Sequence, residues 1–96
     1  MIELEVKIYN QRIAIIIDSR VSHSYIAPNL VEIFQLKKSN HISWMVQLDI
    51  GTKIKINELV KSCPLGMNGL DSFAYLNIIL LGLYDVLIGM DWLDAH

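Results

Sequence analysis

The strict alternation of apolar and polar side chains over residues 2–9 is the feature that most constrains how this chain can fold. A period of two predicts a β-strand with one buried face. Residues 10–11 then offer a short turn, and the continuous apolar run over residues 13–17 predicts a second strand that is covered on both faces. The chain therefore begins with a predicted hairpin, and the polar triplet Asp-Ser-Arg at 18–20 follows its second strand directly.

The rest of the chain shows local patterns of helices, hairpins and short strands. Pro28 suits a first helical position, and Lys37-Lys38 supply cations suited to the C-terminal end of that helix. The other predicted elements are strands at 44–48 and 53–61 around a tip at 49–52, strands near 59–66 and 70–80 around Asn68-Gly69, a buried strand at 86–88 and a helical turn or two at 90–95.

Length, composition and charge limit the domain organisation and the partners. At 96 residues the chain is long enough for one domain, so residues 1–96 are expected to form a single unit. Hydrophobic residues make up 53% of the chain, which is more than an average soluble domain carries and indicates a partner surface. The net charge of −2 offers no basic field for phosphates, so we expect no nucleic-acid partner.

Neither a membrane segment nor a secretory signal is predicted. The most apolar stretch, residues 78–90, is shorter than the roughly 20 residues that cross a bilayer, so we interpret it as buried strand. Glu3 and Glu5 stand where a signal peptide would carry positive charge. The single cysteine, Cys63, has no partner for an internal disulfide, which fits a reducing compartment, and we expect a cytoplasmic location.

Two separated motifs resemble those of the aspartic proteases of gypsy-type long-terminal-repeat retrotransposons. Residues 15–26 read I-I-I-D-S-R-V-S-H-S-Y-I, and residues 84–93 read Y-D-V-L-I-G-M-D-W-L. In that family an apolar strand leads into a D-S-G-A-S-H-S-F-I loop, a flap hairpin follows, and a late strand ends in Gly-Met-Asp-Trp-Leu. The resemblance spans nearly the whole chain. It implies an all-β, retropepsin-like half-barrel with a short helix after the catalytic loop and a C-terminal helical turn.

The resemblance also implies the endopeptidase domain of a retrotransposon polyprotein, which acts as a homodimer on an extended polypeptide. This chemistry uses two carboxylates that share one proton, so a twofold dimer would place two copies of Asp18 at its axis. Ser19 would hydrogen-bond across the dimer and hold the two loops in register. The resemblance implies no cofactor and no metal. It assigns substrate binding to Arg20, Val46, Leu48, Asp49, Ile50, Gly51, Leu87 and Ile88.

The chain departs from the family pattern at Arg20 and Val21, which stand where the family has glycine and alanine. A left-handed backbone at the glycine position would cost arginine about 1–2 kcal/mol. A guanidinium close to Asp18 would lower the pKa of that carboxyl and disfavour the shared proton. Both effects argue against catalysis, whereas an Arg20 side chain that points into solvent would leave the carboxyl unperturbed.

Two other interpretations of the whole chain stay open. One is a retropepsin-like module without activity that dimerises or binds peptides, and the other is an unrelated small β-domain that binds partners through its apolar face. Taken alone, Asp18 would be a turn or capping residue at a strand end. The remaining polar candidates are interpreted as structural or as surface residues, and these are His23, His41, His96, Asp85, Asp91 and Asp94.

Overall fold

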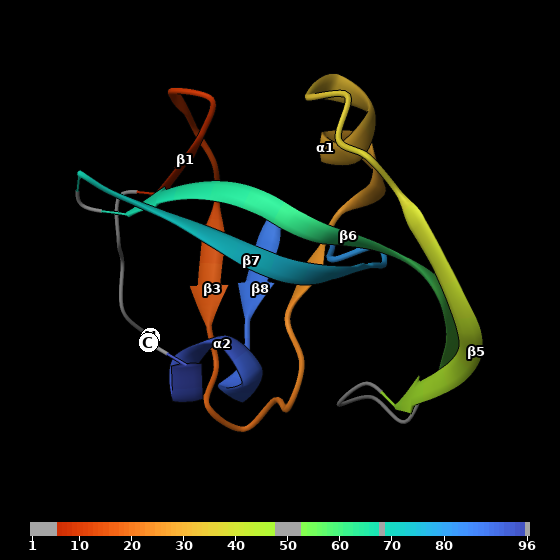
Figure 1. Ribbon diagram of the computed structural model, residues 1–96. Helices are drawn as coiled ribbons and strands as arrows, with labels where there is room; N and C mark the ends of the chain where they lie inside the picture. The colour runs from red at the N-terminus through yellow and green to blue at the C-terminus, as the bar shows by residue number, and fades with distance from the viewer. Residues whose placement is uncertain (1–5, 48–52, 68, 96) are drawn as a thin grey trace.

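The computed structural model describes residues 6–47, 53–67 and 69–95, and Figure 1 shows the course of the chain. Within these residues the chain forms one eight-stranded sheet and two short helices, which confirms the predicted all-β class. The elements in chain order are β1 (Val6–Ile8), β2 (Gln11–Arg12), β3 (Ile15–Ile17), β4 (Tyr25–Ile26), α1 (Pro28–Ile33), β5 (Ser39–Gln47), β6 (Lys53–Met67), β7 (Leu70–Ile78), β8 (Val86–Ile88) and α2 (Met90–Ala95).

The sheet is built around the long hairpin of β6 and β7, which crosses in front of β3 and β8 in Figure 1. Its strand order is β2-β1-β6-β7-β4-β8-β3, and β5 pairs with β6 outside this path. β3 and β8 are parallel neighbours, with Ile17 opposite Ile88. Since parallel neighbours end at the same edge of a sheet, the segments that follow these two residues lie side by side.

The predicted N-terminal hairpin is present, but its turn lies one residue earlier than expected. Lys7 pairs with Arg12, so the turn residues are Tyr9 and Asn10 rather than residues 10–11. Both have positive φ angles, of 50° and 67°. Two-residue turns with positive φ at both positions match the twist of the flanking strands, which explains why the hairpin closes here.

A bend separates β2 from β3, so the predicted continuous strand over residues 13–17 is wrong. The Ala14 amide donates a hydrogen bond of 2.8 Å to the carboxylate of Asp85, and the Asp85 amide donates one of 2.8 Å to the Ala14 carbonyl. β3 begins only after this bend, and it is the last strand in the sheet order. Its three isoleucines are therefore half-buried and not covered on both faces.

α1 begins at Pro28 as predicted, but it ends before the predicted cations. The last helical residue is Ile33, and Gln35 follows with a positive φ of 51°. The left-handed conformation of Gln35 ends the helix in the way that glycine commonly does. Lys37-Lys38 lie beyond this point, so the prediction that they supply cations to the last helical turn is wrong.

The apolar stretch over residues 78–90 is not a continuous buried strand, and that interpretation is wrong. β7 ends at Ile78, and a loop with Gly82 at a φ of 68° leads to β8. Leu80 is 76% exposed and Leu83 is 94% exposed. Hydropathy alone did not distinguish this exposed loop from the short buried strand that follows it.

The main core lies between the curved sheet and α1. Val6 and Ile8 are 1% and 0% exposed, so the alternation predicted for the first strand holds over its described part. The other fully buried members of this core include Ile26, Leu65, Leu76, Val86 and Ile88. A second, smaller cluster is formed by Tyr25, Ile56 and Ile79, with Val21, Leu81 and Leu87 packed against it.

The hairpin predicted around residues 49–52 is confirmed in its two strands, which are longer than expected. β5 pairs antiparallel with β6, and Val46 lies opposite Ile54 near the end of this ladder. The tip, residues 48–52, lies outside the described residues. β6 also continues through the two strands that the sequence pattern divides at about residue 60. In the described part of the chain, no helix has the length and apolar character needed to span a bilayer.

Candidate active site

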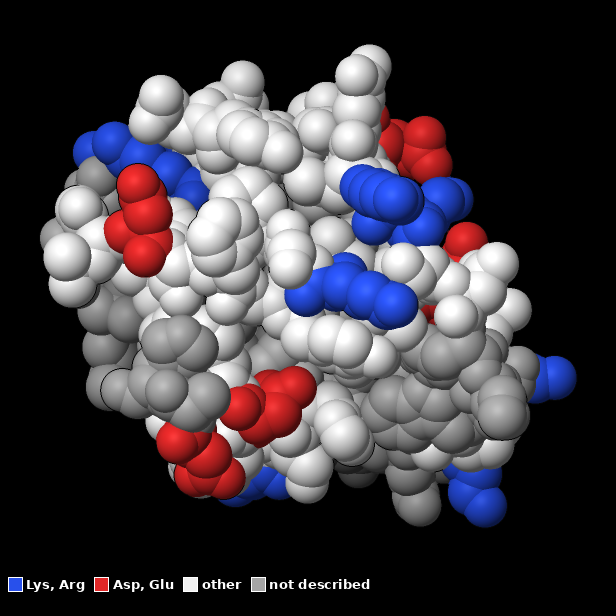
Figure 2. All heavy atoms as spheres, in the orientation of Figure 1, with Lys and Arg blue, Asp and Glu red and all other residues white. Residues whose placement is uncertain are grey.

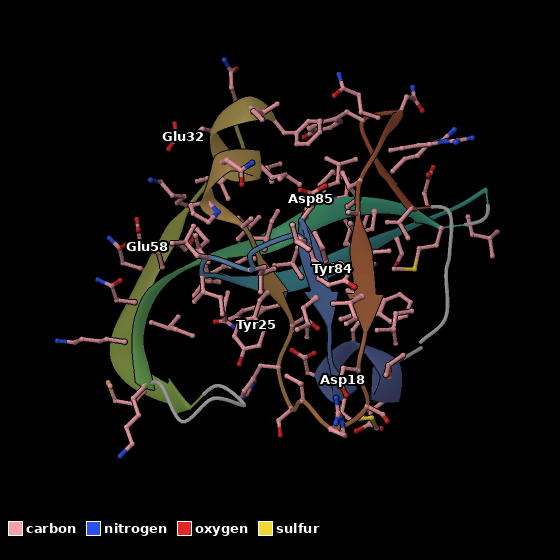
Figure 3. All side chains as sticks on the ribbon, turned by 180° about the vertical axis from the view of Figure 1, so that it is seen from behind. Asp18, Tyr25, Glu32, Glu58, Tyr84 and Asp85 are labelled. Atoms are coloured by element: carbon pink, nitrogen blue, oxygen red, sulfur yellow. The ribbon has the colours of Figure 1, made fainter. Side chains whose placement is uncertain are left out.

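Asp18 lies in a loop at the end of β3, next to the end of β8. Its amide donates a hydrogen bond of 3.0 Å to the Ile88 carbonyl, which continues the β3–β8 ladder by one residue. The Val21 amide then donates to the Asp18 carbonyl at 3.2 Å and closes a turn. Figure 3 shows Asp18 at one end of this strand pair and Asp85 at the other. Asp18, from the first motif, therefore lies beside residues 87–89 of the second motif.

Arg20 donates three hydrogen bonds to the carboxylate of Asp18. Its Nε donates to Oδ1 at 3.0 Å, its Nη2 donates to Oδ2 at 2.9 Å, and its backbone amide donates to Oδ1 at 2.9 Å. The Asp18 side chain is 15% exposed, whereas the Arg20 side chain is 81% exposed. The hydrogen bonds from the Arg20 side chain, and then that from its amide, hold the pKa of Asp18 below its ordinary value.

These contacts decide between the two sequence predictions for Arg20. The alternative in which its side chain points away from Asp18 is wrong. The backbone argument is also wrong, because the described non-glycine residues with positive φ are Tyr9, Asn10 and Gln35, and Arg20 is not among them. The effect of Arg20 on the site is therefore electrostatic, without the left-handed strain.

A hydrogen-bond network centred on Ser24 joins the Asp18 loop to the start of α2. Ser24 is fully buried, and its hydroxyl donates to Asp91 Oδ1 at 2.6 Å while accepting from the Gly89 amide at 3.0 Å. The Ser24 amide donates to Asp91 Oδ2 at 3.2 Å, and the Asn77 side chain donates to the Ser24 carbonyl at 3.2 Å. Asp91 therefore accepts hydrogen bonds that hold the fold together, and we assign it no part in catalysis. Sequence reasoning missed Ser24 and Asn77, although Ser24 and Asp91 each lie in one of the two motifs.

Gly89 allows the Asp18 loop to pass directly over β8. A Cβ atom at this position would overlap the carbonyl oxygen of His23 and would lie 2.6 Å from the carbonyl oxygen of Val21. The Met90 amide donates to the same Val21 carbonyl at 2.7 Å, which fixes the close approach. The glycine in the second motif is therefore required by backbone contact between the two motifs.

The residues predicted to bind substrate differ in burial, and some of them lie outside the described residues. Leu87 is half-buried and packs against the smaller cluster, as Val21 of the loop does. Ile88 is 0% exposed in the main core, so its side chain is not available to a ligand, because successive residues of a strand face opposite sides. Val46 lies in β5, and residues 48–51 lie outside the described residues. No group of three or more His, Cys, Asp and Glu side chains suited to a metal ion is found among the described residues.

The sequence and the fold of this chain are similar to those of known aspartyl proteases. The model of the retroviral aspartyl protease family matches residues 1–96. The chain belongs to this family. Membership accounts for the order of the elements, in which a strand and a loop that carries Asp18 are followed by a helix, a long hairpin and a late strand with glycine directly after it.

A solved structure of this family type has the same fold. The crystal structure of the retroviral protease-like domain of Ddi1 from Leishmania major aligns with a TM-score of 0.72. The alignment covers 97% of this chain and 74% of that one, at 18% sequence identity. No curated protein matches the sequence. The retropepsin-like half-barrel is therefore the fold of this retroviral aspartyl protease domain, as the resemblance implied.

Proposed function

We propose that this chain is the endopeptidase domain of a retrotransposon polyprotein, and that it acts as a homodimer in which each subunit supplies one Asp18. The observation that carries the proposal is the position of Asp18, at the end of β3 and beside the end of β8, in a chain that the family model matches throughout. The chemistry of this family uses two carboxylates that share one proton. Because the Asp18 loop occurs once in the sequence, a twofold axis is the simplest way to bring a second carboxylate to the first.

In the proposed dimer the two copies of Asp18 take different roles. The ionised copy accepts a proton from a water molecule while the water oxygen attacks the peptide carbonyl carbon. The protonated copy donates its proton to the carbonyl oxygen, which gives a neutral tetrahedral intermediate. When this intermediate collapses and the C–N bond breaks, the copy of Asp18 that took the water proton donates it to the amine nitrogen, and the other copy accepts a proton from a hydroxyl of the intermediate. Ser19, which is exposed beside Asp18, is assigned the hydrogen bond between the two loops.

Substrate contacts are assigned to the hairpin of β5 and β6 and to β8. Leu87 lies beside the Asp18 loop, and its side chain belongs to the same cluster as Ile56 of β6. Val46 and the tip residues Leu48, Asp49, Ile50 and Gly51 are assigned to a flap that closes over an extended peptide. Such a peptide would bind through its main chain, as a strand does. For Ile88 the buried side chain leaves only its backbone for this role.

Arg20 favours a second candidate function. Its hydrogen bonds and charge stabilise the ionised form of Asp18, whereas the shared proton requires one carboxyl of the pair to be protonated. Two such arginines at the axis would oppose catalysis. A retropepsin-like module that dimerises or binds peptides without cleaving them is therefore the alternative, and it is supported by this one contact.

Sedimentation and cleavage together test the proposal. We expect the purified chain to dimerise as its concentration rises, and to cleave an extended apolar peptide slowly at acidic pH. Asp18→Asn is expected to abolish cleavage while leaving the dimer intact. A chain that stays monomeric at all concentrations would overturn the shared-carboxylate mechanism, and a dimer without cleavage in any variant would support the inactive module.

A further inference from the structure

Three adjoining hollows lie along the solvent face of β6 and β7, and Asp18 lines none of them. Their volumes are about 460, 500 and 480 Å³. The first and second share Tyr9 and Pro64, the second and third share Lys61, and the first and third share Phe73. We refer to these three hollows together as the outer groove.

The middle hollow of the outer groove is basic. Lys37 and Lys61 line it together with Ser39, Ser62 and Gln35, and no acidic residue belongs to its lining. Neither lysine forms an ion pair with a residue that the structure describes. Two unpaired ammonium groups and two hydroxyls around one hollow form a set of donors suited to an anionic group.

The neighbouring Lys38, by contrast, has two acidic partners. Lys38 Nζ lies 3.9 Å from a carboxylate oxygen of Glu32 and 3.7 Å from one of Glu58. It does not line the middle hollow. In Figure 2 basic atoms lie near the middle and the upper right of this face, over β6 and near α1, with uncharged surface between them.

Unusual backbone angles cluster at the outer groove. The described non-glycine residues with positive φ are Tyr9, Asn10 and Gln35, and all three line the first or the second hollow. Tyr9 and Asn10 form the turn between β1 and β2, and Gln35 follows the end of α1, so these two features of the fold border the outer groove. The left-handed Gln35 also directs the chain into Lys37.

A β-bulge presents Lys61 and Ser62 to solvent together. Val60 pairs with Leu76 and Cys63 pairs with Ala74, so the two residues between them on β6 face a single residue of β7. Lys61 and Ser62 are both exposed, whereas a regular strand would direct one of them into the core. Bulges of this kind commonly redirect side chains toward a binding site.

Aromatic side chains extend along the same face. Tyr9 is 62% exposed, Phe73 is 65% exposed and Tyr75 is 50% exposed, so three large rings along the outer groove are accessible to a partner. The hollows on either side of the basic one include Asp71 and Asp91 in their linings. These carboxylates would repel a continuous chain of phosphates, whereas a polypeptide can alternate carboxylates with apolar side chains.

We propose that the outer groove binds an extended acidic segment of another polypeptide, with a carboxylate between Lys37 and Lys61 and with proline or aromatic side chains against Tyr9 and Phe73. This site uses none of the residues assigned to catalysis. Its basic middle hollow lies near α1, at the end of the molecule opposite the end of β3 that carries Asp18 (Figures 1 and 3). The third hollow extends to His23 of the Asp18 loop and to the start of α2, but Asp18 itself lines no part of the groove.

Calorimetric titration of the full chain with a short blocked peptide tests the proposal. The peptide alternates glutamate with proline and tyrosine, and a matched peptide carries glutamine in place of glutamate. We expect the glutamate peptide to bind at low salt and the glutamine peptide to bind much more weakly. The double variant Lys37→Gln/Lys61→Gln is expected to weaken binding by roughly five- to tenfold, as two exposed ion pairs are lost.

The double variant Lys53→Gln/Lys55→Gln is the matched control, because it removes two positive charges from the same strand, β6, outside the outer groove. We expect it to bind the glutamate peptide as the native chain does. Equal weakening by both double variants, equal binding of both peptides, or an absence of binding would overturn the proposal. Tighter binding of a single-stranded oligonucleotide or of inorganic phosphate at the same lysines would overturn the assignment to a polypeptide.

Discussion

At the scale of single residues, Ser24 links the parts of the site that are far apart in the sequence. Its hydroxyl connects the Gly89 amide to the Asp91 carboxylate, and its backbone binds Asp91 and Asn77. No solvent reaches the Ser24 side chain to replace these bonds. The Ser24 side chain therefore joins the Asp18 loop to α2, beside the backbone hydrogen bonds that the Met90 and Asp91 amides donate to the same loop.

Replacing Ser24 is expected to destabilise the domain. Ser24→Ala removes the acceptor of the buried Gly89 amide and one of the hydrogen bonds to Asp91, and we expect a loss of about 1–3 kcal/mol in the free energy of unfolding. Urea denaturation measures this loss. Ser22→Ala is the control, because Ser22 is exposed and contributes its backbone carbonyl to the Asp91 amide. Equal stability of the two variants would contradict the role given to the Ser24 hydroxyl.

Gly89 offers a second test at the residue scale. Gly89→Ala places a methyl group against the carbonyl oxygens of His23 and Val21, and we expect a cost of about 1–3 kcal/mol from the displaced loop. Gly66→Ala is the matched change, because a Cβ there meets its nearest atom, of Asp71, at 3.6 Å, which is ordinary contact. Thermal unfolding of both variants should show a lower midpoint for the first alone. A normal midpoint for Gly89→Ala would show that the loop can move aside at little cost.

At the scale of elements, the hairpin of β5 and β6 is the part that the proposed function requires to move. Met45, Lys53 and Lys55 are exposed, and β5 has β6 as its partner in the sheet. Strands with little burial open more readily than strands of the core. We therefore expect amides near Met45 and Lys55 to exchange hydrogen faster than those of β8. Equal protection of the two regions in native-state exchange would refute a flap role for this hairpin.

Sequence analysis predicted the elements whose signals lie within their own short stretch of sequence, and it missed features that depend on distant contacts or on very short strands. The alternation around Val6 and Ile8, the proline that begins α1 and the glycine at the turn between β6 and β7 are local signals. β4 was missed because its two residues are too short for a period. The bend at Ala14 was missed because its cause, Asp85, lies 71 positions away in the chain.

The candidate site was predicted in part for the same reason. Two motifs identified Asp18 and the strand beside it, because their spacing is a property of the sequence. The conformation of Arg20 and the bonds of Ser24 depend on contacts across the fold, which the motifs do not specify. The resemblance assigned both Leu87 and Ile88 to substrate contact, but strand register decides which of two neighbouring side chains faces the core, and the motif does not show that register.

At the scale of the whole molecule, the described chain has half of the proposed catalytic centre. The carboxylate of Asp18 is bound by Arg20 of its own loop, and it lies beside the end of β8 rather than inside a described hollow. The half-buried isoleucines of β3 leave apolar surface beside the Asp18 loop. A second copy of the chain would cover such surface and supply the second carboxylate, as the proposal requires.

The central claim is that a proton-sharing pair of Asp18 carboxyls is restrained by Arg20, and cleavage by Arg20→Gly measured against pH tests it most directly. Arg20 lowers the pKa of Asp18, so the native pair keeps its shared proton only at more acidic pH. We expect Arg20→Gly to raise cleavage of an extended apolar peptide by roughly tenfold or more and to extend activity toward higher pH. Asp18→Asn in the same background should abolish the gain. Equal activity and pH dependence of the native chain and the Arg20→Gly variant would contradict the account.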